Sequence, residues 1–154
     1  MFTLDYQLDP IAATKAKAVD MASADSASLR YHLFPGDVVV RGKEGDFSTR
    51  WGWVQILDFA LSLKAIDAIL ERAREARFEF TESSAALEFR RENDGVSVSS
   101  TYAPGLLRIR ASEFREQVQR FAQRVVRELC ERFPRLAGNA EIKLLLANNT
   151  AAVC

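Results

Sequence analysis

The chain has 154 residues, of which 48% are hydrophobic and 27% charged, a composition typical of one globular domain. Lys and Arg together number 21, as do Asp and Glu, so the formal net charge is zero. This balance argues against nucleic-acid binding, and the lack of an apolar run of about 20 residues argues against a membrane span.

The first third of the sequence contains two segments that alternate apolar and polar residues. Residues 2–8 have apolar side chains at every second position, which predicts a first strand. Residues 29–33 alternate again, and Pro35-Gly36 predicts a turn into another strand at 38–40. Between them, the Ala-rich segment 11–27 fits either a short helix or a mobile connection, and both remain open.

A long helix is predicted over residues 51–72, with Ser48 or Thr49 as its cap. Its apolar residues recur at intervals of three and four, and a second apolar stripe lies beside the first. A stripe this wide indicates burial against two neighbours, most simply a sheet and another helix.

Residues 77–111 read as a meander of four antiparallel strands with apolar residues at every second position. Turns are predicted at Ser83-Ser84, Asp94-Gly95 and Pro104-Gly105. Closing the chain there pairs Phe78 with Phe89, Phe89 with Ser100, and Tyr102 with Leu107. One face is then apolar throughout, and the other carries polar side chains: Glu79, Thr81, Glu88, Arg90, Ser97, Ser99, Thr101, Arg108 and Arg110.

A second long helix is predicted over residues 112–133, capped by Ser112 and ended by Pro134. Asn139 is expected to cap a last short helix, and residues 148–154 are expected to be a frayed tail. The fold predicted for residues 1–154 is therefore a single α+β domain. An antiparallel meander sheet of about six to seven strands has two long helices packed on one face.

The sequence offers no set of residues for catalysis, for a cofactor or for a metal ion. His32 is the single histidine, and there is no Gly-rich phosphate loop. Cys130 and Cys154 lie far apart in the sequence, which indicates neither a disulfide framework nor a metal site and favours a cytoplasmic location. Glu79 and Glu88 are interpreted as solvated cross-strand charges rather than a catalytic pair.

The order of elements resembles that of the small immunity proteins of bacterial toxin systems, including those of contact-dependent growth inhibition. The resemblance covers residues 46–134: Trp-Gly-Trp-Val-Gln-Ile-Leu-Asp-Phe-Ala opens the long helix, Phe-Glu-Phe-Thr-Glu-Ser opens the meander, and a Phe-rich helix closes it. It implies a cytoplasmic protein that binds a cognate toxin domain and covers its active site. It assigns no role to individual residues.

The leading hypothesis is therefore a non-enzymatic protein-binding domain that neutralises a toxin domain by steric binding. The predicted contacts are Glu79, Glu88, Arg90, Arg108 and Arg110 on the polar face, with Trp51, Lys43, Glu44 and Asp46 at its rim. One alternative is a small-molecule-binding protein or enzyme with a pocket lined by Phe78, Phe89, Tyr102 and Phe121. Another is a homodimer joined through a sheet edge, so the chain is expected to be a monomer or a homodimer.

Overall fold

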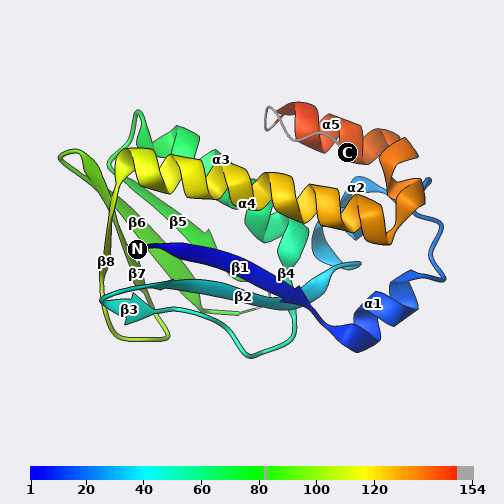
Figure 1. Cartoon of the computed structure of the whole chain (residues 1–154), viewed down its shortest axis with the longest axis horizontal. Coiled ribbons are helices and arrows are strands. Elements are labelled where there is room, and N and C mark those ends of the chain that lie inside the picture. Colours follow the sequence, from blue (N-terminus) through cyan, green and yellow to red (C-terminus); the bar gives the residue numbers. More distant parts are fainter. Residues whose placement is uncertain (82, 149–154) are drawn as a thin grey trace.

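Two four-stranded antiparallel sheets and the helices packed against them make up the computed structural model, which describes residues 1–81 and 83–148 (Figure 1). Sheet A comprises β1 Thr3–Leu8, β2 Pro35–Gly42, β3 Gly45–Asp46 and β4 Val54–Gln55. Sheet B comprises β5 Glu75–Glu79, β6 Ala86–Glu92, β7 Gly95–Ser100 and β8 Leu107–Arg110. The helices are α1 Pro10–Ala16, α2 Ser26–Tyr31, α3 Ile56–Leu70, α4 Ala111–Arg132, the 3-10 helix η1 Pro134–Gly138, and α5 Ala140–Asn148.

The predicted α+β class, with antiparallel strands and two long helices, is confirmed. The described part of the chain has eight strands divided between two sheets, rather than six to seven strands in one sheet. The expected tail at 148–154 falls almost wholly outside the described residues, which end at Asn148.

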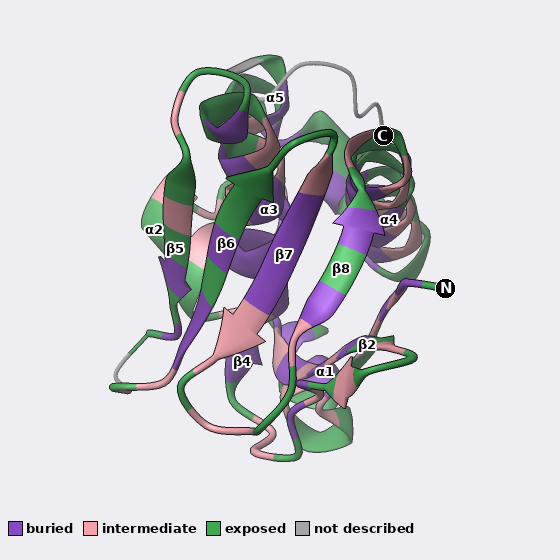
Figure 2. Ribbon diagram, turned by 90° about the vertical axis from the view of Figure 1, so that its left-hand side faces the viewer, coloured by how far each residue is buried: buried purple, intermediate pink, exposed green. Residues whose placement is uncertain are grey.

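Sheet B is covered by the two long helices on one face. α3 packs against β5 and β6, and α4 packs against β7 and β8. The strands bury a continuous apolar set beneath these helices: Phe78, Leu87, Phe89, Val96, Val98, Leu107 and Ile109. Figure 2 shows the opposite face toward the viewer, and no described helix lies over it.

The register of sheet B differs from the predicted one at each hairpin, always by an even number of residues. Phe89 lies opposite Val98 instead of Ser100, and Leu107 lies opposite Val98 instead of Tyr102. Phe78 lies opposite Leu87 instead of Phe89. Because side chains alternate between faces with a period of two, an even shift leaves every side chain on its predicted face.

The hairpin between β6 and β7 shows where the shift arises. Glu92 pairs with Gly95, so the turn is centred on Asn93 and Asp94 rather than on Asp94 and Gly95. Asn93 has a φ of 52°, in the left-handed region that asparagine tolerates better than most residues. The asparagine therefore supplies the left-handed residue of this turn.

The segment preceding β2 departs most from the prediction. Residues 26–31 form α2 rather than a strand, with the Asp25 side chain accepting a hydrogen bond from the Ser28 backbone N–H. Pro35-Gly36 begins β2 instead of forming a turn, and Gly36 lies opposite Leu8 of β1. A Cβ at Gly36 would lie 2.1 Å from the Gln7 carbonyl oxygen, so only glycine fits this close approach.

The helix boundaries were predicted with mixed success. α3 begins at Ile56, five residues later than expected, and neither Ser48 nor Thr49 caps it. α4 has nearly the predicted span. Its N-cap residue is Arg110, whose side chain makes no capping hydrogen bond, so the prediction of Ser112 as the cap is wrong. Asn139 does cap α5, because its Oδ1 accepts hydrogen bonds from the backbone of Glu141 and Ile142.

Segment 11–27, for which two conformations were left open, is only partly helical. α1 covers its first part, with the Asp9 side chain as cap, and turns lead from there to α2. Ala13, Ala16 and Met21 are buried, so this small-residue segment lies against the core.

Aromatic contacts join the two sheets and the long helices into one apolar core. Phe114 of α4 lies 6.0 Å from Phe2 at the start of sheet A and 5.8 Å from Phe89 of sheet B, measured between ring centroids. Phe59 of α3 lies 5.8 Å from Phe121 of α4 and 5.2 Å from Phe78 of β5.

Cys130 lies half-buried on α4 and is disulfide-bonded, which the spacing of the cysteines did not indicate. The argument from unpaired cysteines to a cytoplasmic location loses its support. None of the described helices is long and apolar enough to cross a bilayer.

Candidate protein-interaction face

The outer face of sheet B, opposite the helices, presents polar side chains from all four strands, and those of β5, β6 and β8 are charged. They come from alternate positions of the strands: Glu75, Arg77 and Glu79 on β5, Glu88, Arg90 and Glu92 on β6, Ser97 and Ser99 on β7, and Arg108 and Arg110 on β8. Apart from the serines, all are exposed. This set defines the outer face.

The strand register places opposite charges side by side on the outer face. Glu75 lies opposite Arg90, and their side chains form an ion pair of 2.6 Å. Arg77 lies opposite Glu88 at 3.4 Å and also reaches Glu79 along its own strand at 3.2 Å. Exposed ion pairs of this kind contribute only about 0–1 kcal/mol to stability. Their charges therefore remain available to a partner that can replace them.

The structure places all five predicted sheet residues on this face. Glu79, Glu88, Arg90, Arg108 and Arg110 are exposed and lie on β5, β6 and β8. Of the other four predicted members, Ser97 and Ser99 lie on β7, and Thr81 and Thr101 lie just beyond the ends of β5 and β7.

Three charged members of the face were missed. Glu75 and Arg77 belong to β5, which begins earlier than predicted, and Glu92 ends β6. The alternation that reveals a strand does extend back through Ala76 to Glu75, but the predicted meander begins only at residue 77.

The predicted rim loop lies at the β8 side of the face. Glu44, in the turn between β2 and β3, reaches Arg108 at 3.7 Å, and Gly45 forms a β-bridge with Gly105. Gly105 has a φ of 115°, and a Cβ there would lie 2.7 Å from the Glu44 carbonyl oxygen. Both the backbone conformation and the close approach require glycine, so the loop and the face are held together.

The other two rim residues are exposed in the same loop. A hydrogen bond from Ser48 lowers the pKa of the Asp46 carboxyl below its usual value, so this side chain stays ionised at neutral pH. Lys43 lines a small hollow with Glu44 and Arg108 between this loop and β8. The structure therefore brings Lys43, Glu44 and Asp46 to the rim as predicted, although it does not test their role.

The two tryptophans differ in exposure. Trp51 is half-buried, with its ring centroid 5.2 Å from Phe80 and 5.0 Å from Tyr102. Trp53 stacks on Trp51 at 4.9 Å and is 38% exposed. The predicted rim contact Trp51 is therefore half-buried, and Trp53 is the more exposed indole of the pair.

A single carboxylate holds the loop that carries these tryptophans. Asp37 Oδ1 accepts hydrogen bonds from the Thr49 hydroxyl at 2.7 Å, the Trp51 backbone N–H at 2.7 Å and the Gly52 backbone N–H at 2.9 Å. Gly52 has a φ of 78°, which a side chain would strain. These contacts explain why the chain turns at 49–52 and delays the start of α3.

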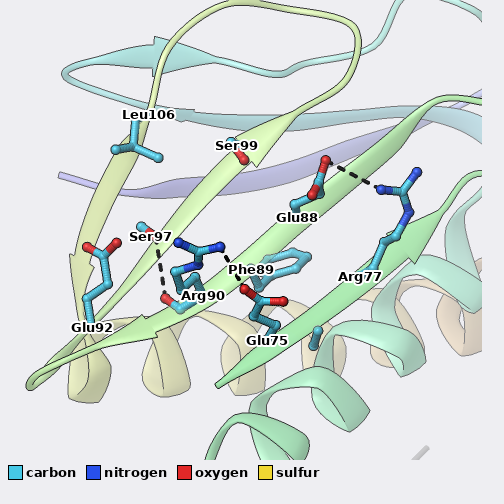
Figure 3. Close-up of a pocket in the computed structure, with 10 residues that line it drawn as sticks. Glu75, Arg77, Glu88, Phe89, Arg90, Glu92, Ser97, Ser99 and Leu106 are labelled. Atoms are coloured by element: carbon cyan, nitrogen blue, oxygen red, sulfur yellow. Dashed lines mark hydrogen bonds and ion pairs between the residues drawn. The ribbon is translucent and has the colours of Figure 1, made fainter. Parts of the chain in front are cut away.

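A shallow hollow of about 550 Å³ opens on the outer face (Figure 3). Ser97 and Ser99 of β7 form its floor, since they are the smallest side chains on this face. Glu88, Arg90 and Glu92 stand along the β6 side, and Leu106 lies across from them. The hollow is mixed in charge and open to solvent, which suits contact with another macromolecule.

The aromatic residues proposed to line a ligand cavity instead pack against other groups. Phe78 and Phe121 both contact Phe59, and Phe89 contacts Phe114. The Tyr102 hydroxyl donates a hydrogen bond of 2.5 Å to the Phe47 carbonyl, and burial raises its pKa. These contacts leave the pocket hypothesis without a structural observation in its favour.

Two other sets of polar residues lie on or next to α2. His32 follows α2 and is exposed, not on a strand as predicted. Arg30 pairs with the buried Asp58, and both contact Ser62, which accounts for their partners within the fold. Within residues 1–81 and 83–148, no group of three or more His, Cys, Asp or Glu side chains is arranged to hold a metal ion.

Comparisons with protein-family models, with curated proteins and with solved structures find no match to this chain. The functional argument therefore depends on the geometry and chemistry of the outer face.

Proposed function

We propose that this chain is a non-enzymatic protein-binding domain that neutralises a bacterial toxin domain by docking over it, as immunity proteins do. The outer face of sheet B is the proposed contact surface, with the loop of Lys43, Glu44 and Asp46 at its rim. Trp53, the exposed member of the tryptophan pair, replaces Trp51 as the proposed aromatic contact.

The observation that supports this proposal most directly is the one-sided covering of sheet B. Both long helices lie on the inner face, while the outer face carries ten polar side chains of mixed charge. Many sheets have a solvated face, so polarity alone does not indicate a partner. The alternating charges add a pattern that a partner with complementary charges can recognise, which favours rapid and specific association.

The proposal places the chain in the cytoplasm, where an incoming toxin domain would act, with no nucleic acid or membrane as partner. Disulfides are more typical of oxidising compartments, so the disulfide at Cys130 makes the location a separate question. Fractionation of the native cells tests the location: recovery in the cytoplasmic fraction supports the proposal, and periplasmic recovery contradicts it. Thiol labelling of the recovered protein then reports whether Cys130 is oxidised in that fraction.

The function is tested by co-expression with the toxin domain encoded by the neighbouring reading frame. We expect the two proteins to co-purify and the chain to rescue growth. Reversing the charges of Glu79, Glu88, Arg90, Arg108 and Arg110 together should abolish rescue and weaken binding at least about tenfold, since several complementary contacts become repulsive.

A matched control reverses charges on the outer surface of α4, for example at Arg127 and Glu131, which lie away from the face. This variant should rescue growth normally. Rescue that survives reversal of the five face charges would reject the proposed surface, and lack of any co-purification would reject the proposed function.

A further inference from the structure

β5 is an outermost strand of sheet B, and its hydrogen bonds show which of its backbone groups face β6 (Figure 2). The Phe80 N–H donates to the Ala85 carbonyl at 3.0 Å, and the Arg91 N–H donates to the Arg74 carbonyl at 2.8 Å. Such bonds recur at every second residue of an antiparallel pair, so the even-numbered residues of β5 face β6. The backbone N–H and C=O groups that point away from the sheet belong to the odd-numbered residues: Glu75, Arg77 and Glu79. None of these groups has a hydrogen-bond partner among the described residues.

The other strands at sheet edges are covered or very short. The free edge of β8 meets the turn between β2 and β3, where Gly45 forms a β-bridge with Gly105. The free edge of β1 lies against α4, and Arg124 donates a hydrogen bond of 3.4 Å to the Leu4 carbonyl. β3 and β4 have two residues each, too few to pair stably with another chain. Among the described strands, β5 is therefore the one with an open edge.

β5 also lacks the features that commonly prevent pairing at an open edge, such as a proline, a bulge or a charge on the buried side. It pairs with β6 without interruption from Glu75 to Glu79, and its inward side chains are Ala76 and Phe78. Its charged side chains all lie on the outer face, so they do not block the plane of the sheet. The five residues of β5 can therefore accept another strand.

The order of charges on β5 decides which strand fits. Glutamate, arginine and glutamate alternate at positions 75, 77 and 79, and this order reads the same in both directions. If a second copy paired antiparallel in full overlap, two Arg77 side chains would lie opposite each other and Glu75 would lie opposite Glu79. Like charges directly opposite each other destabilise a sheet. A strand with basic, acidic and basic residues at these positions instead places an opposite charge beside each one.

We propose that β5 binds an extended segment of the protein partner as an additional antiparallel strand of sheet B. Basic, acidic and basic residues of the segment face Glu75, Arg77 and Glu79, and the apolar residues between them cover Ala76 and Phe78. Antiparallel pairing is slightly more stable per residue than parallel pairing. Backbone hydrogen bonds provide the attachment, and the charges determine the register. This inference rests on the proposed function, because it states how the partner is held beside the outer face.

The open edge is tested first on the isolated full chain, by amide hydrogen exchange. The amides of Arg77 and Glu79 should exchange at least about tenfold faster than those of Ala76 and Phe78, which bond to β6. Equal protection of the two sets would overturn the inference. Protection of Arg77 and Glu79 that rises with protein concentration would mean that a second copy occupies the edge, which also overturns it.

The chemistry of the segment is tested with the peptide acetyl-Thr-Lys-Val-Glu-Val-Lys-Thr-amide, here called the strand peptide. The peptide is titrated into the 15N-labelled chain and observed by two-dimensional NMR. Saturable shifts are expected in the amides of Glu75, Arg77 and Glu79. A control peptide in which Lys and Glu are exchanged places like charges opposite each other, and should bind at least about fivefold more weakly. Equal binding of the two peptides would contradict the proposed charge order.

N-methylated versions of the strand peptide separate strand pairing from charge attraction. In the proposed pairing the N–H of the central Glu points to β5, whereas the N–H of each Val points away from it. Methylation of the Glu nitrogen should therefore abolish saturable binding, and methylation of a Val nitrogen should leave most of it. The same loss in both would show that the peptide does not bind as a strand.

A charge exchange adds a test on the protein side. Arg77→Glu should weaken binding of the strand peptide about fivefold, and a peptide with Lys in place of the central Glu should restore it. Arg127→Glu, an exposed change on α4 away from β5, should leave binding unchanged. The amide spectrum of each variant reports whether the fold is intact.

The complex with a toxin domain distinguishes this inference from the proposed function. In the complex, the amides of Arg77 and Glu79 should become protected from exchange. A toxin domain that binds without protecting them overturns the strand inference and leaves the proposed function standing. Binding of the strand peptide without any toxin partner would instead remove the proposed function and retain the open edge as a binding site.

Discussion

The inner and outer faces of sheet B are made from alternate residues of the same strands, yet they differ in what holds them in place. Phe89 on the inner face is 3% exposed and packs against Phe114, whereas Arg90, the next residue, is exposed and forms an ion pair in water. Burial of apolar surface provides most of the stability, and exposed ion pairs add little. The outer face can therefore vary in charge without loss of the fold, as a recognition surface requires.

The largest expected effect compares adjacent residues of β6. Phe89→Ala removes a buried ring and should lower the free energy of unfolding by about 3–5 kcal/mol. Arg90→Ala should change it by less than about 1 kcal/mol. Equilibrium urea unfolding, followed by circular dichroism, measures both. Equal losses would contradict the division between the two faces.

The next comparison is between a buried and an exposed ion pair. Asp58 is 6% exposed on α3 and accepts a hydrogen bond from Arg30. Asp58→Ala leaves Arg30 without its partner and should cost about 2–3 kcal/mol, somewhat below the value for a fully buried pair because Arg30 is partly exposed. Asp58→Asn can still accept from Arg30 and should lose less, as measured by the same unfolding experiment.

Tyr102 provides a pH-dependent test at the boundary between the faces. Burial raises its pKa above that of a free tyrosine, near 10, so above about pH 10 the unfolded state ionises more readily than the folded state. The stability contributed by the protonated hydroxyl is full below pH 10 and is lost as pH rises toward the folded pKa.

Tyr102→Phe should therefore lower stability by about 1 kcal/mol at pH 8, because the hydrogen bond to Phe47 is lost. The variant should also lose less stability than the original protein between pH 9 and 11. Part of the alkaline loss should remain, since burial and the hydrogen bond to Glu128 also raise the pKa of Tyr6. An identical alkaline loss in both proteins would exclude Tyr102 as a source.

The smallest effect is expected within the outer face itself. A double-mutant cycle on Glu75 and Arg90 should give a coupling of about 0.2–1 kcal/mol, which decreases as salt is added. The matched cycle on Glu75 and Arg108, which form no ion pair with each other, should give a coupling near zero. A coupling well above this range would mean that the outer face contributes substantially to stability.

The sequence predicted the two faces of sheet B more reliably than the register that produces them. The strand pairings differ from the predicted ones by two or four residues, yet Glu88, Arg90 and Arg108 still lie on the outer face. A strand repeats every two residues, and each error was an even number. Local alternation therefore determined the face, while turn geometry, which decides the register, was harder to predict.

Short segments were not predictable from alternation alone. Residues 29–33 alternate as a strand would, but five residues cannot distinguish a strand from one turn of an amphipathic helix. The residue that indicates a helix here is Asp25, because an aspartate at the N-cap accepts a hydrogen bond from the backbone N–H three residues later, here that of Ser28. Leu29 is buried in α2 and would also be buried in a strand, so its apolar side chain does not distinguish a helix from a strand.

The tryptophan loop was not predictable because its conformation depends on a residue distant in the sequence. Asp37 lies 14 residues before Trp51, and its carboxylate orders the loop that places Trp51 inside and Trp53 outside. Periodicity near the tryptophans continues smoothly into α3, so it predicted a helix that begins too early.

The stacked indoles also provide an optical label within the protein. Two indole rings 4.9 Å apart and 15° from parallel couple their electronic transitions, so circular dichroism in the far ultraviolet should contain an exciton signal from this pair. Trp51 and Trp53 are the only tryptophans in the sequence, and all indole fluorescence therefore comes from one place. Docking of a protein near this end of sheet B can be followed by both signals without attaching a dye.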